Sequence, residues 1–277
     1  RTRQNQRGVL PTLYLLGRST TMSYETILYE KQGRVAQITL NRPEKLNAMN
    51  PTLLEELSEA VEVFDQDDES WIGILTGAGR SFCAGRDVQM FRDRLHGHEV
   101  QSTRRLGPPF LGDMKSGKPI IGAVHGHIFG LGLMLAGECD ILLATENARF
   151  GMTEVRRSLS GGAVWARLSQ WIPGKIASEM AITGEPISGI EAHRLGLVNK
   201  LVTEQQLLTS AISIAQRIIE LPPLATRATV QAIRGASYHF IRERSSQAPS
   251  VQLNKTEDYK ESINSFLEKR PPVYNAR

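Results

Sequence analysis

Residues 120–132 read Ile-Ile-Gly-Ala-Val-His-Gly-His-Ile-Phe-Gly-Leu-Gly and carry the clearest signal for the fold. The short apolar run 120–124 is typical of a buried strand, and Gly126 marks the turn at its end. The same order of apolar run and glycine turn occurs at 72–79, and a further apolar run follows at 140–144. Strands of this kind, alternating with helices and glycine turns, predict a layered α/β core and not a β-sandwich or a helix bundle.

A strand in which apolar and polar residues alternate, and a helix with an N-cap, precede this core. Apolar residues occupy alternate positions of 36–40, and this period of two turns one face of a strand toward a core. The sequence Asn41-Arg42-Pro43 ends that strand, and a helix is expected from Pro51 with Asn50 as its N-cap. One face of this helix is apolar, so we expect it to be buried: it carries Leu53, Leu57, Ala60, Val61 and Phe64.

The last third of the chain has a helical pattern. Apolar residues keep helical spacing over 207–219, and Pro222-Pro223 ends that run. Earlier, Ser188 and Glu191 form a capping box that predicts the start of a helix, ahead of a strand-like run at 197–202. We therefore divide the chain into an appended segment 1–21, a core 22–205 and a C-terminal helical region 206–277.

Composition excludes several classes of protein. The chain has 277 residues, of which 40% are hydrophobic and 22% are charged, as in an ordinary globular domain. The formal net charge of +4 equals the contribution of four arginines in the acid-free segment 1–21, so residues 22–277 are neutral and no nucleic-acid-binding stripe is expected. No apolar run approaches the ~20 residues of a membrane span. Two cysteines without a CxxC spacing suit a reducing compartment.

Residues 1–21 stand apart from the rest because they contain arginine, serine and threonine but no acidic residue and no helical periodicity. We consider three interpretations: an over-extended gene start, a short mitochondrial targeting segment, and a disordered arm. The first is favoured, because Met22 follows the segment directly. A soluble cytoplasmic protein is expected, or a mitochondrial one if the segment is a targeting signal.

Three glycine-containing stretches hold the candidate chemistry: 81–87, 126–132 and 150–154. Each follows a predicted strand, where glycine allows the backbone to approach a ligand and a following helix directs its free N–H groups outward. Two N–H groups that converge in this way form an oxyanion hole. Taken alone, such turns are common and usually structural.

Together these stretches resemble the crotonase family, which includes the enoyl-CoA hydratases and isomerases. The resemblance extends from about residue 23 to the end of the chain. It rests on segments 42–49, 82–88, 123–140, 150–154, 195–198 and 266–270. It implies an α/β fold, a crotonase-type spiral of ββα units with a C-terminal helical trimerisation region, assembled as a homotrimer or a dimer of trimers. It also implies acyl-CoA substrates and no separate cofactor.

The resemblance assigns roles residue by residue. The backbone N–H groups of Arg86 and Leu131 fall at the two oxyanion donors, and Glu154 falls at the acid/base position. A carboxylate in an apolar pocket has a raised pKa, which suits it to proton exchange near neutral pH. The remaining candidates line the CoA and acyl path: Lys45, Ala48, Ala84, Asp87, Val88, Gly130 and Met134. For Lys45, a solvated surface lysine is an equally good interpretation.

Met134 departs from the pattern of the family's hydratases, which carry a second glutamate at this position. A single carboxylate is sufficient for a 1,3-proton shift, so the residues favour double-bond isomerisation, with hydration second. Hydrolysis of an acyl-CoA thioester or of a carbon–carbon bond is a third possibility within the family. A non-catalytic RNA-binding or CoA-binding protein is the alternative from another class.

Five further residues receive structural interpretations. Glu138 lies one helical turn beyond Met134, too far from the acyl site to act as a second acid, and is expected to be buried with a partner. His125 and His127 share a strand face without a third ligand, so no metal is expected. Arg156 and Arg157 are unusual additions beside Glu154, and two interpretations are open: solvated side chains, or partners of acidic residues in a neighbouring subunit. If either approached Glu154, it would lower the pKa of that carboxyl group.

Overall fold

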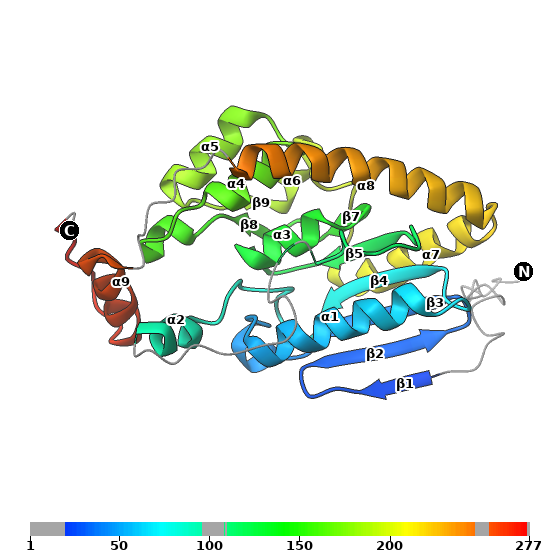
Figure 1. Ribbon diagram of the computed structural model, residues 1–277, viewed down its shortest axis with the longest axis horizontal. Helices are drawn as coiled ribbons and strands as arrows, with labels where there is room; N and C mark the ends of the chain where they lie inside the picture. Colours follow the sequence, from blue (N-terminus) through cyan, green and yellow to red (C-terminus); the bar gives the residue numbers. More distant parts are fainter. Residues whose placement is uncertain (1–19, 96–107, 109, 247–254, 276–277) are drawn as a thin grey trace, which may run out of the picture.

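A computed structural model describes residues 20–95, 108, 110–246 and 255–275 of the chain (Figure 1). Its larger sheet has seven strands in the order β1-β2-β3-β4-β5-β7-β10. The strands span Thr20–Ser23, Ile27–Gln32, Val35–Leu40, Ile72–Gly77, Ile120–Val124, Ile141–Ala144 and Lys200–Leu201. Strands β1 to β3 pair antiparallel, whereas every pairing from β3 to β10 is parallel. The α/β class predicted from the sequence is therefore confirmed.

A smaller sheet contains β6 (His127–Phe129), β8 (Arg149–Gly151) and β9 (Ile187–Ser188). Units of strand, strand and helix connect the two sheets. The chain passes from β5 to β6 and into α3 (Leu131–Gly137), and from β7 to β8 and the turn η3 (Glu154–Arg157). After β4, a bridge between Cys83 and Ile128 takes the place of the second strand, before α2 (Val88–Leu95). This repetition is the predicted spiral of ββα units.

Helix α1 (Pro51–Gln66) begins where the sequence predicts. The Asn50 side chain accepts a hydrogen bond from the Leu53 N–H at 2.9 Å, and Pro51 is the first helical residue. The expected apolar face is buried in the larger hydrophobic core, between this helix and the sheet. On the opposite face of the sheet, α7 (Leu207–Ile219) packs on β4, β5 and β7 and forms the second core cluster.

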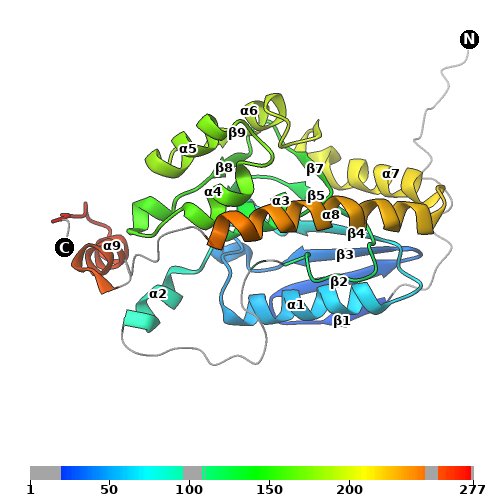
Figure 2. The ribbon, with the colours of Figure 1, turned by 45° about the horizontal axis from the view of Figure 1, so that its top comes forward.

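The other helices lie in the second half of the chain. They are α4 (Gly162–Leu168), α5 (Gly174–Thr183), α6 (Gly189–Arg194), α8 (Pro223–Ser246) and α9 (Glu257–Leu267), with the short turn η4 (Glu204–Gln206). The short turn η2 (Pro43–Lys45) lies earlier, between β3 and α1. The long helix α8 runs along the outside of the layers, and α9 lies beside α2 at the end of the molecule opposite the α7–α8 connection (Figures 1 and 2). The helical character predicted after residue 203 is confirmed. No helix among the described residues is long and apolar enough to cross a membrane.

Two local predictions were wrong in part. Only Lys200–Leu201 of the run 197–202 is a strand, because the N–H groups of Leu197 and Val198 donate to Ala192 O and complete the end of α6. Ser188 caps α6 through the Glu191 N–H, but the Glu191 carboxylate pairs with Arg194. Strand β1 begins inside the segment 1–21 that was expected to be appended, while residues 1–19 lie outside the described part of the chain.

Candidate active site

A cavity of about 1110 Å³ lies where η2, the loop before α2, the start of α3, η3, α4 and α9 meet. It contains every site residue predicted from the sequence. These residues are Lys45, Ala48, Ala84, Arg86, Asp87, Val88, Gly130, Leu131, Met134 and Glu154. Segments far apart in the chain, from the first turn η2 to the last helix α9, thus enclose one space. The chemical role of each residue stays a prediction.

The first loop is held by a parallel bridge between Met49 and Arg86. The Met49 N–H donates to Gly85 O at 2.8 Å, and the Asp87 N–H donates to Met49 O at 2.9 Å. In such a parallel bridge, the two residues that flank Arg86 make both hydrogen bonds to Met49. The N–H of Arg86 itself is therefore directed away from Met49. Gly85 has φ +99°, and a Cβ there would lie 3.0 Å from Phe129 O, so glycine permits this close approach of the loops.

The second loop places the Leu131 N–H at the first position of α3. The first four N–H groups of a helix lack acceptors within it, and in α3 the Met134 N–H donates to Gly130 O at 3.0 Å. Gly130 has φ +51°, and a Cβ at this position would lie 2.6 Å from Glu154 Oε1. The Glu154 carboxylate therefore lies against the Gly130 backbone, one residue from the Leu131 N–H.

Glu154 begins the turn η3 and faces the cavity. Burial raises the pKa of its carboxyl group, and a hydrogen bond from its own backbone N–H opposes the rise. Its Oε2 is buried and has no hydrogen-bond partner among the described residues. Neither neighbouring arginine pairs with it: Arg156 pairs with Glu185, and the Arg157 guanidinium lies over the Phe266 ring. The carboxylate thus lines the cavity and keeps one oxygen without a hydrogen-bond partner in the described chain.

The other carboxylate that lines this cavity in the described chain is already paired. Asp87 accepts from Arg42 Nη1 at 2.9 Å. Met134 is buried with 3% of its surface exposed, so an apolar thioether lines the cavity at the position where the sequence resemblance predicted a second glutamate in hydratases. Glu138 accepts from the Phe110 and Leu111 N–H groups at 2.6 and 2.8 Å, which confirms the prediction of a buried glutamate with a partner.

Comparison with known proteins shows the family of this chain. Residues 30–277 match the sequence family described as enoyl-CoA hydratase/isomerase. The chain belongs to this family, within the crotonase superfamily. It is 35% identical to the short-chain-enoyl-CoA hydratase of Clostridium acetobutylicum, covering 90% of this chain and 97% of the relative. It is 37% identical to the (E)-benzylidenesuccinyl-CoA hydratase of Thauera aromatica, covering 90% of this chain and 98% of that relative.

Solved structures give the same result. The carnitinyl-CoA hydratase of Mycobacterium avium superposes with a TM-score of 0.73 at 34% identity, over 92% of this chain and all of that one. An enoyl-CoA hydratase/isomerase of Mycobacterium paratuberculosis gives a TM-score of 0.70 at 33% identity, with the same coverage. This family member is therefore an acyl-CoA-processing enzyme with the crotonase fold.

Sequence reasoning assigned no role to two residues that shape the site of this family member. Arg42 joins the turn η2 to the first loop through Ala48 O and Asp87. Asn47 is fully buried; its side-chain amide donates to Ala78 O and Ser81 O, and its carbonyl accepts from the Arg42 N–H. Both residues lie in the segment 42–49 that carries the family resemblance. The resemblance identifies the segment, but it does not show which of its side chains hold the active-site loop in place.

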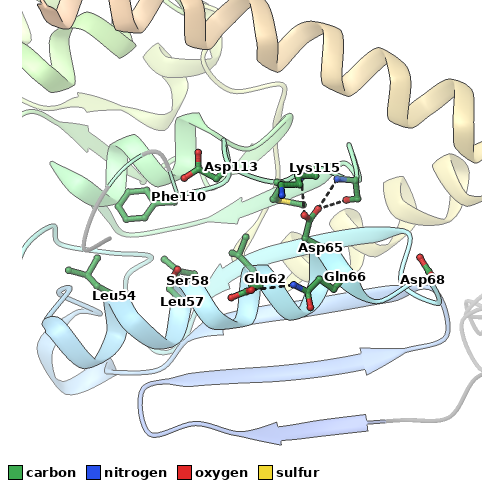
Figure 3. A pocket seen from close by; sticks show the side chains of 13 residues that line it. Leu54, Leu57, Ser58, Glu62, Asp65, Gln66, Asp68, Phe110, Asp113 and Lys115 are labelled. Atoms are coloured by element: carbon green, nitrogen blue, oxygen red, sulfur yellow. Dashed lines mark hydrogen bonds between the residues drawn. The ribbon is translucent and has the colours of Figure 1, made fainter. Parts of the chain in front are cut away.

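A second cavity, of about 600 Å³, lies between α1 and residues 110–116 (Figure 3). It contains none of the predicted site residues. Its Asp65 carboxylate accepts from the Lys115 and Ser116 N–H groups and so holds that loop to α1.

The described residues contain no cluster of three or more histidine, cysteine or acidic side chains that could hold a metal ion. His125 and His127 instead make hydrogen bonds with Gly79 O and Ser81 Oγ.

Proposed function

We propose that this enzyme shifts the double bond of a 3-enoyl-CoA to give the 2-enoyl-CoA, with Glu154 as the single acid and base. The observation that carries the proposal is the buried methionine at position 134. Adding water across a double bond benefits from two carboxylates, one to orient the water and one to supply a proton. A 1,3-proton shift requires one group that removes a proton and returns it.

In this mechanism the Glu154 carboxylate removes a proton from C2, and the electron pair of that C–H bond delocalises onto the thioester oxygen. The N–H groups of Arg86 and Leu131 donate hydrogen bonds to that oxygen and stabilise the dienolate. The protonated Glu154 then returns the proton to C4, and a double bond forms between C2 and C3. The raised pKa of Glu154 makes its carboxylate a stronger base for the first step.

Hydration of a 2-enoyl-CoA is the second candidate, because curated relatives at about 35% identity are named as hydratases. In that reaction, Glu154 would have to activate the water and deliver the proton in turn. The two candidates share the cavity and the oxyanion donors and differ in their products. Their rates can therefore be compared in one preparation of the enzyme.

The first experiment compares wild type with Glu154→Gln on 3-hexenoyl-CoA and 2-hexenoyl-CoA. General acid–base catalysis contributes roughly 10²–10⁴ in rate, so we expect the substitution to lower the isomerisation kcat by about that factor. Glu59→Gln, on an exposed position of α1, is the control and should retain wild-type turnover. Isomerisation that survives in Glu154→Gln would exclude Glu154 as the base.

Met134→Glu tests whether the methionine at position 134 is the reason that isomerisation is favoured over hydration. The substitution places a carboxyl group in the cavity wall, where hydratases of the family carry theirs. We expect the ratio of hydration to isomerisation to rise by at least 10-fold, because one carboxylate can orient water while the other supplies the proton. Met134→Gln is the matched control of similar size without the charge. An unchanged ratio in Met134→Glu would mean that residue 134 does not select the reaction.

A further inference from the structure

Arg157 is a cation in the active-site cavity for which the described part of the chain supplies no carboxylate partner. Its side chain is half-buried and lines both the catalytic cavity and a neighbouring space of about 570 Å³ beside α9. Within the described part of the chain, no carboxylate forms an ion pair with it. Arg157 donates a hydrogen bond to Arg156 O at 3.2 Å, and its guanidinium lies 3.9 Å from the centre of the Phe266 ring. Burial lowers the pKa of the guanidinium, nearby Tyr274 opposes this shift, and the neighbouring Arg156 adds to it.

The surroundings of Arg157 keep it in this position. Helix α9 is fastened to the segment after Glu154 by hydrogen bonds from Ser158 Oγ to Asp258 O at 3.0 Å and from Ser262 Oγ to Arg156 O at 3.4 Å. Phe266, on the same helix, presents its ring to the guanidinium. The neighbouring Arg156 differs, because it pairs with the exposed Glu185. Arg157 is therefore oriented by packing, and its charge is left for a ligand.

The turn η3 relates Arg157 directly to the catalytic centre. Glu154 and Arg157 are the first and last residues of this 3₁₀ turn, and side chains three residues apart eclipse in such a helix, about 6 Å apart along its axis. Both line the same cavity. The proposed reaction places C2 and C4 of the acyl group beside Glu154, and we take the acyl chain to run from there toward Arg157 on the same wall.

We propose that the natural substrates carry a carboxylate at the far end of the acyl group, which Arg157 binds through paired N–H···O hydrogen bonds. This inference rests on the proposed function, because it takes the position of the acyl group from the role of Glu154. A planar guanidinium matches a carboxylate in geometry and charge. An uncharged acyl chain would instead leave the half-buried cation without a partner, which weakens binding.

Binding of saturated thioesters tests the inference without requiring turnover. The ligands are adipyl-CoA, its ω-methyl ester and hexanoyl-CoA, and the dissociation constants are measured by calorimetry. Since hydrogen bonds between charged groups contribute about 1.5–3 kcal/mol, wild type should bind adipyl-CoA about 10- to 100-fold more tightly than the ester. Arg157→Met should remove this preference, and hexanoyl-CoA should bind the variant at least as tightly as wild type, because no unpartnered cation then faces its acyl chain. Arg157→Lys should keep part of it, and Arg194→Met, the loss of an exposed arginine outside the cavity, should keep all of it.

Two results would overturn the inference. Equal affinity of wild type for adipyl-CoA and its methyl ester would show that no acyl carboxylate is recognised. A similar loss of affinity for all three ligands in Arg157→Met would show that the guanidinium binds the phosphates of CoA, or supports α9, and not the acyl end. Failure of the proposed isomerisation would appear separately, as absence of turnover on both hexenoyl-CoA substrates with the adipyl-CoA preference intact.

Discussion

At the scale of single residues, the most informative group is the carboxyl group of Glu154. Its Oε1 lies against Gly130 and its Oε2 has no hydrogen-bond partner in the described chain, so the folded protein solvates the charged form poorly. Burial therefore raises its pKa above the ordinary value of 4.5. A poorly solvated carboxylate favours proton exchange and lowers the stability of the fold.

The pH dependence of stability follows from this direction. Because the folded protein binds the Glu154 proton more tightly than the unfolded chain does, the folded state loses stability as pH rises from about 4.5 through the raised pKa. Glu154→Gln cannot ionise and avoids this loss. We therefore expect its Tm to exceed that of wild type at pH 8 and the difference to shrink toward pH 4. A Tm difference that is constant with pH in differential scanning calorimetry would contradict the raised pKa.

At the scale of elements, the turn η2 and the segment that follows it position the first loop of the active site. Leu46 and Asn47 both have positive φ, at 51° and 54°, so the chain turns sharply into the cavity wall. The hydrogen bonds of Asn47 offset this unfavourable backbone. They join the end of η2 to the carbonyls of Ala78 and Ser81, just before the loop that contains Arg86.

We expect Asn47→Ala to lower the free energy of unfolding by about 2–4 kcal/mol, because it leaves the buried Ser81 carbonyl, the partly buried Ala78 carbonyl and the Arg42 N–H without this partner. It should also lower kcat, since the first loop loses its support. Urea denaturation and steady-state kinetics measure the two effects. Asn50→Ala, which removes the N-cap of α1, is the neighbouring control with an expected cost of about 1 kcal/mol. A cost for Asn47→Ala no larger than that of the control would argue against this role.

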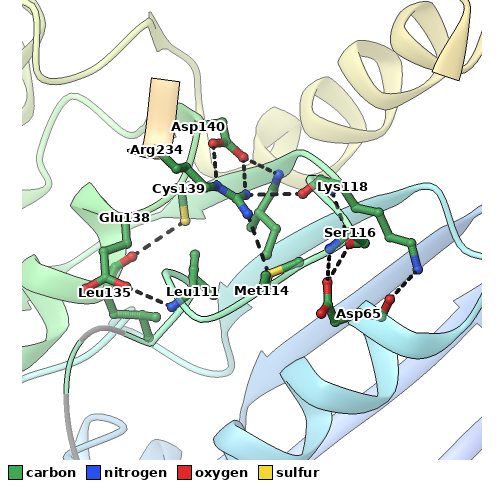
Figure 4. Close-up of polar contacts among 11 residues, drawn as sticks. Asp65, Leu111, Met114, Ser116, Lys118, Leu135, Glu138, Cys139, Asp140 and Arg234 are labelled. Carbon is green, nitrogen blue, oxygen red and sulfur yellow. Dashed lines mark hydrogen bonds and ion pairs between the residues drawn. The ribbon is translucent and has the colours of Figure 1, made fainter. Parts of the chain in front are cut away.

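At the scale of the whole molecule, polar contacts tie α8 to the sheet and to α1 (Figure 4). Arg234 of α8 binds both oxygens of Asp140 and donates to Lys118 O at 3.1 Å. Asp140 also accepts from the Ile120 N–H at 2.7 Å, at the start of β5. The buried ammonium of Lys118 donates to the carbonyls of Phe64, Asp65 and Asp67 at the end of α1.

Breaking this buried pair from one side should be costly. Arg234→Met leaves the Asp140 carboxylate without its cation, and loss of one partner of a buried ion pair typically costs about 3–5 kcal/mol. The double variant Asp140→Asn/Arg234→Met should cost less than the sum of the single changes, because no charge is left unpaired. Urea denaturation of all three variants measures this coupling. Additive losses would show that the pair does not hold α8 to the core.

Local sequence patterns were sufficient to predict those elements that are stabilised by contacts between residues close in sequence. The cap at Asn50, the apolar face of α1 and the buried strands β4, β5 and β7 were predicted from periodicity and residue type, because each depends on neighbours within a few positions. The predictions failed in part at 188–202. There Leu197 and Val198 have strand-like residue types, but their N–H groups close a preceding helix.

The sequence by itself determined the α/β class, the family and the residues that could form the site, because glycine turns, apolar runs and ordered motifs are local properties of the chain. Only the tertiary structure decided that Glu154 is poorly solvated, that Asp87 is paired with Arg42, and that Arg157 is held over Phe266 with no carboxylate from the described chain. Solvation and ion pairing depend on which segments, distant in sequence, pack around a group in space. The order of residues along the chain does not show which segments these are.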